Sequence, residues 1–280
     1  MISQNEIRRI AGFLGVDPRV IDHDYVLGCF LHYLSQQDEA KQSWVFKGGT
    51  SLAKCHFEGY RFSEDIDFTV LEALTETALL RIVDAAKKRM QESIGIHTDF
   101  QDTKVDVIQD DYGQESFEAK LYYQGAWEYG GSPRSLRVHI NRDETIVFAP
   151  QKKAIIHNFS DREQLATSTL QVYSLEEVLV EKLRAFSGQR KFAIARDLFD
   201  LHHLSRHGVS VEAAIGAFEM KCQVKGIQIS DLRLDRVLGR KEEYRANWKN
   251  QLDYLIPKEL KIPFETAWDE SLKLIRRVIK

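Results

Sequence analysis

The sequence predicts a mixed α/β (α+β) fold in which a sheet-containing first half, residues 1–160, is followed by an α-helical second half, residues 161–280. Two observations support this division. In the first half, short apolar segments typical of strands stand between segments with helical spacing, whereas from about Ser174 the spacing is mostly helical. No Gly- or Ser-rich linker separates the halves, so we expect them to pack closely together.

The elements of the first half follow from capping residues and from the period of the apolar positions. Asp17-Pro18 predicts the start of a helix, because aspartate caps helices and proline fits the first turn. Ile66, Phe68 and Val70 alternate with polar residues, which predicts a strand. The other expected elements are a buried strand at 44–46, helices at 51–57 and 75–93, and strands at 105–108, 119–123 and 136–140.

The second half begins at a sequence that fits a capping box. Ser174 is the expected cap, and Glu177, three residues on, is expected to bond back to it. This helix should run to Ser187-Gly188, and a second should span about Phe192 to Arg206. Further helices are expected up to Lys280.

Composition excludes several classes of protein. The net charge of −3, from 39 basic and 42 acidic residues, excludes a basic coat over the whole chain. The three cysteines lie far apart without a CxxC pair, which argues against a disulfide framework or structural zinc site and favours a reducing compartment. The N-terminus does not resemble a signal peptide, and the longest apolar stretch is too short to span a bilayer. We therefore expect a soluble, cytoplasmic protein with no membrane partner.

A Gly-Gly pair, Gly48 and Gly49, stands between the strand expected at 44–46 and the helix that follows. Glycines there let the backbone approach a ligand closely, and a helix N-terminus offers N–H groups and a positive dipole end. Phosphate suits such a site. The spacing matches neither a P-loop nor GxGxxG, and an isolated Gly-Gly pair is more often a simple turn.

Asp65 and Asp67 stand two residues apart on the strand expected at 65–70. Residues two apart on a strand face the same side, so the two carboxylates project together. Such oxygen ligands suit Mg²⁺, which proteins hold with one or two carboxylates plus substrate phosphates. Alone, this pair is more often a solvated strand face. Together with the Gly-Gly turn, it favours a joint site for a triphosphate and a metal ion.

Here the residues also resemble a known family. Lys47-Gly48-Gly49-Thr50-Ser51-Leu52 and Tyr60-Arg61-Phe62-Ser63-Glu64-Asp65-Ile66-Asp67-Phe68 are similar to the signature of the AbiEii/AbiGii toxins, which are polymerase-β-like nucleotidyltransferases with the MenT toxins as relatives. The segments 181–185 and 196–201 resemble the C-terminal motifs of the same family. The resemblance implies a polymerase-β-like nucleotidyltransferase core, a helical C-terminal domain, and an active site in the cleft between them.

The resemblance also implies roles for individual residues. Nucleotide binding would fall to Gly48, Gly49, Thr50, Ser51, Ser63 and Lys182. Asp65 and Asp67 would hold the divalent metal, Mg²⁺ or Mn²⁺, and act in catalysis with Lys182 and Asp197. Lys182 would contact the phosphates of the NTP substrate, and Asp197 would be a further essential acid.

One position departs from this pattern. Nucleotidyltransferases of this fold usually supply a third carboxylate from a later strand, and here His139 stands in the corresponding place. Asp106, Asp143 and Glu144 are other candidates for the missing acid. His139 would either take the proton of the attacking hydroxyl at neutral pH or be a buried, hydrogen-bonded side chain.

A basic stretch runs from Lys182 to Arg196 without any acidic residue. With Lys152 and Lys153 it would form a positive wall beside the active site that holds a nucleic-acid backbone. The alternative is an ordinary solvated helix face, with Arg196 paired to Asp200 one turn on.

The implied function is transfer of an NMP from an NTP to an acceptor, as the toxin of a type IV toxin–antitoxin or abortive-infection system. Some members of the family modify the 3′ end of tRNA, and a winged-helix antitoxin repressor is the implied partner. Two alternatives stay open: a nucleotide-binding regulatory module that has lost catalysis, and a transferase that acts on a protein or a small molecule. No motif indicates which NTP is used.

Overall fold

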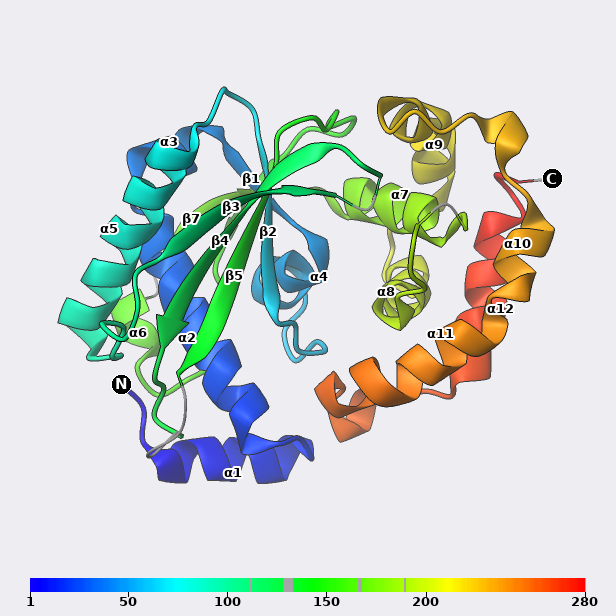
Figure 1. Ribbon diagram of the computed structural model, residues 1–280. Coiled ribbons are helices and arrows are strands. Elements are labelled where there is room, and N and C mark those ends of the chain that lie inside the picture. Colours follow the sequence, from blue (N-terminus) through cyan, green and yellow to red (C-terminus); the bar gives the residue numbers. More distant parts are fainter. Residues whose placement is uncertain (111, 128–132, 166–167, 189, 280) are drawn as a thin grey trace.

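A seven-stranded mixed sheet forms the centre of the first half, with the strand order β3-β4-β5-β2-β1-β7-β6 (Figure 1). The computed structural model describes residues 1–110, 112–127, 133–165, 168–188 and 190–279. Strand β1 is antiparallel to β2 and parallel to β7, and β2 is parallel to β5. The strands are β1 (Trp44–Lys47), β2 (Asp65–Val70), β3 (Lys104–Gln109), β4 (Glu115–Tyr123), β5 (Arg134–Asn141), β6 (Gln151–Ala154) and β7 (Thr169–Val172).

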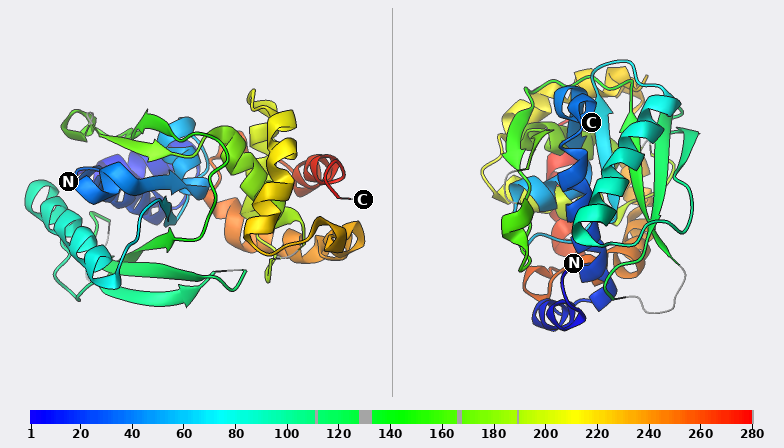
Figure 2. Two further views of the ribbon diagram at one scale, coloured as in Figure 1. Left: turned by 90° about the horizontal axis from the view of Figure 1, so that it is seen from above. Right: turned by 90° about the vertical axis from the view of Figure 1, so that its left-hand side faces the viewer.

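Helices α2 (Pro18–Leu34) and α5 (Glu76–Ile94) cover one face of this sheet and pack against each other (Figures 1 and 2). The Asp17 side chain accepts a hydrogen bond from the backbone N–H of Arg19, which confirms the predicted helix start. The helices are α1 (Gln4–Leu14), α2 (Pro18–Leu34), α3 (Asp38–Ser43), α4 (Gly48–Ser51), α5 (Glu76–Ile94) and α6 (Arg162–Leu165). Helix α4 continues directly into a π-helical turn, Leu52–His56.

The second half is built from helices that stand beside the sheet, and the two termini lie at opposite ends of the molecule (Figure 1). The helices are α7 (Leu175–Phe186), α8 (Ala195–Arg206), α9 (Val211–Val224), α10 (Leu234–Gly239), α11 (Lys241–Asn247) and α12 (Phe264–Ile275). Within the described ranges, no helix has both the length and the apolar character needed to cross a membrane.

Strand β1 is buried on both sides because it separates two apolar cores. Trp44 and Phe46 pack into the core under α2 and α5, whereas Val45 faces the core of the helical half. Since side chains alternate along a strand, this four-residue strand anchors both halves. The Gly-Gly turn that follows β1 is therefore held at the junction of the two cores.

The predicted strands and the helix at 75–93 are present, with ends shifted by a few residues, and α1, β6 and β7 were not predicted. Strand β7 lies after residue 160, yet it pairs in parallel with β1 inside the sheet. We therefore propose that the change from sheet to helices falls at Ser174, the cap of α7, instead of after residue 160.

The predicted capping box at Ser174 is only half correct. The Ser174 hydroxyl accepts from the backbone N–H of Glu177, as expected. The carboxylate of Glu177 points elsewhere and accepts from the backbone N–H groups of Val147 and Phe148. The ammonium of the buried Lys221 also lies 2.8 Å from this carboxylate. Tertiary contacts therefore override the local capping pattern.

Candidate active site between the sheet and the helical half

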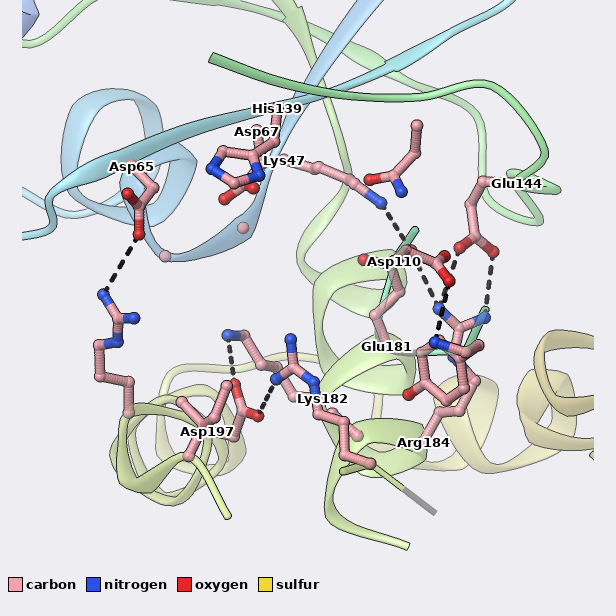
Figure 3. A pocket seen from close by; sticks show the side chains of 18 of the residues that line it. Lys47, Asp65, Asp67, Asp110, His139, Glu144, Glu181, Lys182, Arg184 and Asp197 are labelled. Atoms are coloured by element: carbon pink, nitrogen blue, oxygen red, sulfur yellow. Dashed lines mark hydrogen bonds and ion pairs between the residues drawn. The ribbon is translucent and has the colours of Figure 1, made fainter. Parts of the chain in front are cut away.

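A cavity of about 390 Å³ lies between the sheet and helices α7 and α8 (Figure 3). Residues from the Gly-Gly turn, β2, the β3–β4 hairpin, β5, α7 and the start of α8 line it. Among them are the predicted site residues Gly48, Gly49, Ser63, Asp65, Asp67, Lys182 and Asp197. The fold thus brings together side chains that lie more than a hundred residues apart in the sequence.

The Gly-Gly turn requires glycine for two separate reasons. Gly48 has a positive φ of 75°, and a Cβ atom there would stand 2.6 Å from Oδ2 of Asp67.

The predicted nucleotide ligands Thr50 and Ser51 do not line the cavity. Both are buried: the Thr50 hydroxyl donates to the carbonyl of Asp65, and that of Ser51 donates to the carbonyl of Gly48 at 2.9 Å. These hydroxyls therefore brace the turn.

Asp65 and Asp67 project into the cavity from β2, while Ile66 and Phe68 are fully buried behind them. No group of three or more His, Cys, Asp or Glu side chains is arranged around a metal position in the part of the chain that the structure describes. Two carboxylates on one face, completed by phosphate oxygens and water, are nevertheless a donor set that suits Mg²⁺. Asp65 and Asp67 are thus the residues that fit a divalent metal.

At the position where a third carboxylate is usual, the strand register places His139. His139 is the direct partner of Asp67 across the β2–β5 pair, and Glu118 is the partner of His139 across β4–β5. Nε2 of His139 lies 3.3 Å from the Glu118 carboxylate. The acid Glu118 is therefore present on β4, one strand further from β2 than His139. It was not predicted from the sequence, although it alternates with the apolar Phe117 and Ala119.

The other candidate acids lie elsewhere. Asp106 is exposed on the edge strand β3, and Asp143 is exposed in the loop after β5. Glu144 lines the cavity but turns to Arg184, with oxygen–nitrogen distances of 2.9 and 3.1 Å.

Opposite β2, five charged residues form what we call the cavity cluster: Arg61, Lys182, Arg190, Asp197 and Asp200. Nζ of Lys182 lies 2.6 Å from Oδ1 of Asp197 and 3.0 Å from Oδ2 of Asp200. Burial would lower the pKa of Lys182, but Asp197 and Asp200 outweigh it and raise that pKa. Among the described residues, the cluster has three basic and two acidic members, and Lys182 and Arg190 line the cavity on either side of Asp197.

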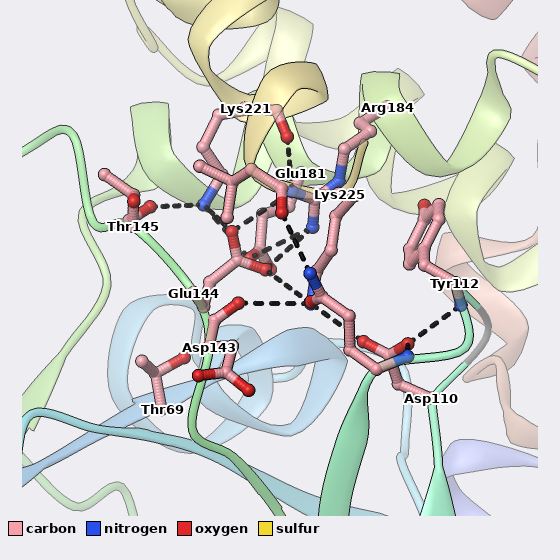
Figure 4. Close-up of polar contacts among 12 residues, drawn as sticks. Thr69, Asp110, Tyr112, Asp143, Glu144, Thr145, Glu181, Arg184, Lys221 and Lys225 are labelled. Atoms are coloured by element: carbon pink, nitrogen blue, oxygen red, sulfur yellow. Dashed lines mark hydrogen bonds and ion pairs between the residues drawn. The ribbon is translucent and has the colours of Figure 1, made fainter. Parts of the chain in front are cut away.

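A second set of charges, the buried network, lies at the far end of the cavity (Figure 4). Its members are Lys47, Asp110, Glu144, Glu177, Glu181, Arg184, Lys221 and Lys225. Nζ of the fully buried Lys221 lies 2.8 Å from both Glu144 and Glu177. Burial would raise the pKa of Glu181, but Lys47 and Lys221 outweigh it and hold that pKa well below its usual range.

The basic stretch from Lys182 to Arg196 does not form a continuous positive wall. Arg184 is buried in the network, and Arg190 donates to Asp197 at 2.8 Å. Arg196 does not pair with Asp200 as the alternative interpretation predicted, because it lies across the cavity at 3.8 Å from Asp65. Lys152 and Lys153 lie on β6 and do not line the cavity.

Comparison with known proteins identifies the family. MenT4, a nucleotidyltransferase toxin from Mycobacterium tuberculosis, has the same fold with a TM-score of 0.64 and 20% identity, over 99% of this chain and 90% of that one. JHP933 from Helicobacter pylori matches with a TM-score of 0.55 and 19% identity, over 94% and 93%. No curated protein matches the sequence.

The model of the nucleotidyl transferase AbiEii toxins of type IV toxin–antitoxin systems matches residues 32–270, nearly the whole chain. The predicted resemblance and the nucleotidyltransferase core with a helical C-terminal half are thereby confirmed. The chain therefore belongs to the AbiEii family of nucleotidyltransferase toxins.

Proposed function

We propose that this nucleotidyltransferase transfers an NMP from an NTP to the 3′ end of tRNA, in the cytoplasm and in the presence of Mg²⁺ or Mn²⁺. The observation that carries the proposal is the pairing of two unlike surfaces across one cavity. Carboxylates of Asp65 and Asp67 on one side suit a metal ion, and the ammonium of Lys182 in the cavity cluster on the other side suits phosphates.

In this proposal the chain's own residues place the triphosphate. The backbone of Gly48 and Gly49 approaches the phosphates closely, and Lys182 contacts them as a point charge. Asp65 and Asp67 would hold a divalent metal, which would supply positive charge to stabilise the charge that develops on the phosphates. The oxygen of the acceptor hydroxyl bonds to the α-phosphorus while its proton passes to solvent, the bond from the α-phosphorus to the oxygen that bridges it to the β-phosphorus breaks, and pyrophosphate leaves.

The partners follow from the family. A toxin of a type IV toxin–antitoxin system has an antitoxin, which we propose is a winged-helix repressor. The exposed Lys191 and the cavity-lining Arg196 are the basic groups that we assign to contacts with an RNA backbone. An RNA acceptor predicts that activity falls steeply with ionic strength, because phosphate contacts release counterions.

The test is label transfer from each of the four α-³²P-labelled NTPs to total tRNA with Mg²⁺. Wild-type protein should label RNA, and Asp65→Ala should not. Asp106→Ala, which removes an exposed acid outside the cavity, is the matched control and should retain activity. Periodate-oxidised tRNA, which lacks the terminal diol, should remain unlabelled.

Other outcomes assign the protein to the alternative classes. Label on a protein or a small molecule would refute the tRNA acceptor while keeping the transferase. NTP binding without transfer to any acceptor would instead indicate a nucleotide-binding module that has lost catalysis.

A further inference from the structure

Arg61 and Asp200 join the two halves of the molecule directly beneath the Gly-Gly turn. Nε and Nη2 of Arg61 each donate to a different oxygen of Asp200, both at 2.7 Å. The hydroxyl of Tyr60 donates to the same carboxylate at 2.9 Å. The side chains of Arg61 and Asp200 are 1% and 0% exposed, and Asp200 does not line the cavity. Asp200 can therefore act on a ligand only through its neighbours.

One of those neighbours is Lys182, whose ammonium lies 3.0 Å from Asp200. A lysine side chain is a point charge on a flexible four-carbon stem, so its position must be fixed by partners. Asp200 is fixed in turn, because the planar fork of Arg61 binds both of its oxygens. Burial would raise the pKa of Asp200, but Arg61 and Lys182 outweigh it and keep the carboxylate ionised.

The other neighbour is the backbone of the turn. A Cβ atom on Gly49 would stand only 2.3 Å from Nη2 of Arg61. The guanidinium is thus packed against the glycine itself, and a shift of Arg61 would displace the turn. The same shift would move Lys182 through Asp200. The Arg61–Asp200 ion pair therefore fixes the positions of both proposed phosphate-binding groups, the Lys182 ammonium and the backbone of Gly49.

We propose that Arg61 and Asp200 are positioning residues that hold the ammonium of Lys182 and the backbone of Gly49 in one geometry, so that the NTP phosphates meet both together. The inference rests on the proposed role of this cavity in NTP binding. Stability is a weak explanation for the pair, because apolar replacements of buried ion pairs are often equally stable.

The first test is the isosteric change Asp200→Asn, with each MgNTP titrated calorimetrically in the absence of an acceptor. We expect binding at least about 10-fold weaker and kcat/KM about 100-fold lower, because a displacement near 1 Å costs about that much. The KM for NTP should rise while the KM for tRNA stays the same. A purely structural role would lower the active fraction, and hence kcat, without changing either KM.

The second test is the apolar double variant Arg61→Met/Asp200→Leu, with Tm measured beside the NTP affinity. We expect its Tm to exceed that of Arg61→Met, while NTP binding stays at least about 10-fold weaker than in wild type. Asp24→Asn is the matched control, since it breaks the buried Lys54–Asp24 pair at 2.7 Å, away from the cavity. That control should bind NTP like wild type.

Two results would overturn the inference: wild-type NTP affinity in Asp200→Asn, or wild-type affinity in a folded double variant. The calorimetric readout needs no acceptor. A wild-type protein that binds NTP but labels no tRNA would refute the proposed acceptor and still leave the positioning role open to this test. A wild-type protein that binds no NTP would refute both proposals.

Discussion

The cavity cluster and the buried network are both built from α7 and a neighbouring helix, but they differ in the exposure of the lysine at their centre. The network has four basic and four acidic members, and its charges are satisfied by one another and by backbone groups such as the carbonyl of Thr145. At the centre of the network, Lys221 is 0% exposed and does not line the cavity, whereas Lys182 in the cavity cluster is 15% exposed and lines it. A fully buried lysine among acidic partners suits a structural link, whereas a lysine that lines a cavity is suited to an anionic ligand.

The same comparison concerns which elements each set joins. The network ties α9 to α7 and to the hairpin and loop around Asp110 and Glu144. The cluster connects α7 and α8 to Arg61, which packs against Gly49 in the Gly-Gly turn. We infer that the network fixes the helical half on the sheet, and that the cluster then presents Lys182 to the nucleotide.

The largest effect is expected opposite the cluster, at Asp67. Asp67→Asn removes a charge that we assign to metal binding, which is worth several kcal/mol of transition-state stabilisation, or about 1000-fold in rate. Label transfer under saturating NTP measures this loss. Asp106→Asn is the control, and an Asp67→Asn enzyme with more than a tenth of wild-type activity would contradict the assignment.

Lys182→Met should lower kcat/KM by about 100-fold, because the carboxylate of Asp197 then faces the phosphates without the ammonium that pairs with it. The loss should appear chiefly as weaker NTP binding, which titration calorimetry measures. If Lys182→Met binds NTP as wild type does, the cavity cluster is not the phosphate site.

Lys221→Met should lower the stability of the fold and leave the activity nearly unchanged. Removing one partner from a buried charge network costs roughly 3 kcal/mol, which lowers Tm by roughly 6–12 °C in a chain of this size. Thermal unfolding measures the shift, and kcat/KM at 20 °C should stay within about threefold of wild type. A large loss of activity without a Tm change would mean that the network acts in catalysis.

The smallest effect is expected in the pH dependence of stability, and it comes from His203, which belongs to neither the cavity cluster nor the buried network. Burial lowers the pKa of His203 to about 4 from the ordinary 6.5. The unfolded chain therefore takes up a proton before the folded one does, so His203 makes the free energy of unfolding fall as pH drops from about 6.5 to about 4.

Urea unfolding at pH 7, 6, 5 and 4.5 measures the slope. His203→Asn should reduce it by the equivalent of up to about one proton in that range. Asp200 and Glu181, whose pKa values are lowered, begin to contribute below about pH 5, and they do so equally in wild type and in the variant. An unchanged slope in the variant would contradict the assignment of this loss to His203.

Local patterns in the sequence predicted the part of the site that is carried by short motifs. The strand of Asp65 and Asp67 follows from alternation, and the Gly-Gly turn follows from its place between a strand and a helix. Lys182 and Asp197 were placed at the site by family resemblance, and the structure shows both lining the cavity.

The partners of these residues depend on tertiary packing and could not be predicted. One of the two interpretations of the basic stretch paired Asp200 with Arg196 one turn away, but Asp200 binds the buried Arg61, 139 residues distant. For the network, one signal was available in the sequence. Lys221 lies on the same face of α9 as the buried Ala214, Ala217 and Phe218, a position where a lysine must have buried acidic partners.

Strands β6 and β7 were missed for a related reason. Gln151, Lys152 and Lys153 show no apolar alternation, because β6 is the exposed edge of the sheet. Its partner β7 is only four residues long and owes its place to the pairing with β1.

The central claim is that the triphosphate and its metal lie between Asp65 and Asp67 on β2 and Lys182 on α7. A crystal structure with Mn²⁺ and a non-hydrolysable NTP, recorded at a wavelength where manganese scatters anomalously, tests it most directly. We predict an anomalous peak coordinated by both aspartates, phosphates against Gly48 and Lys182, and Arg196 displaced from Asp65. A manganese peak or a triphosphate located anywhere else would contradict the account.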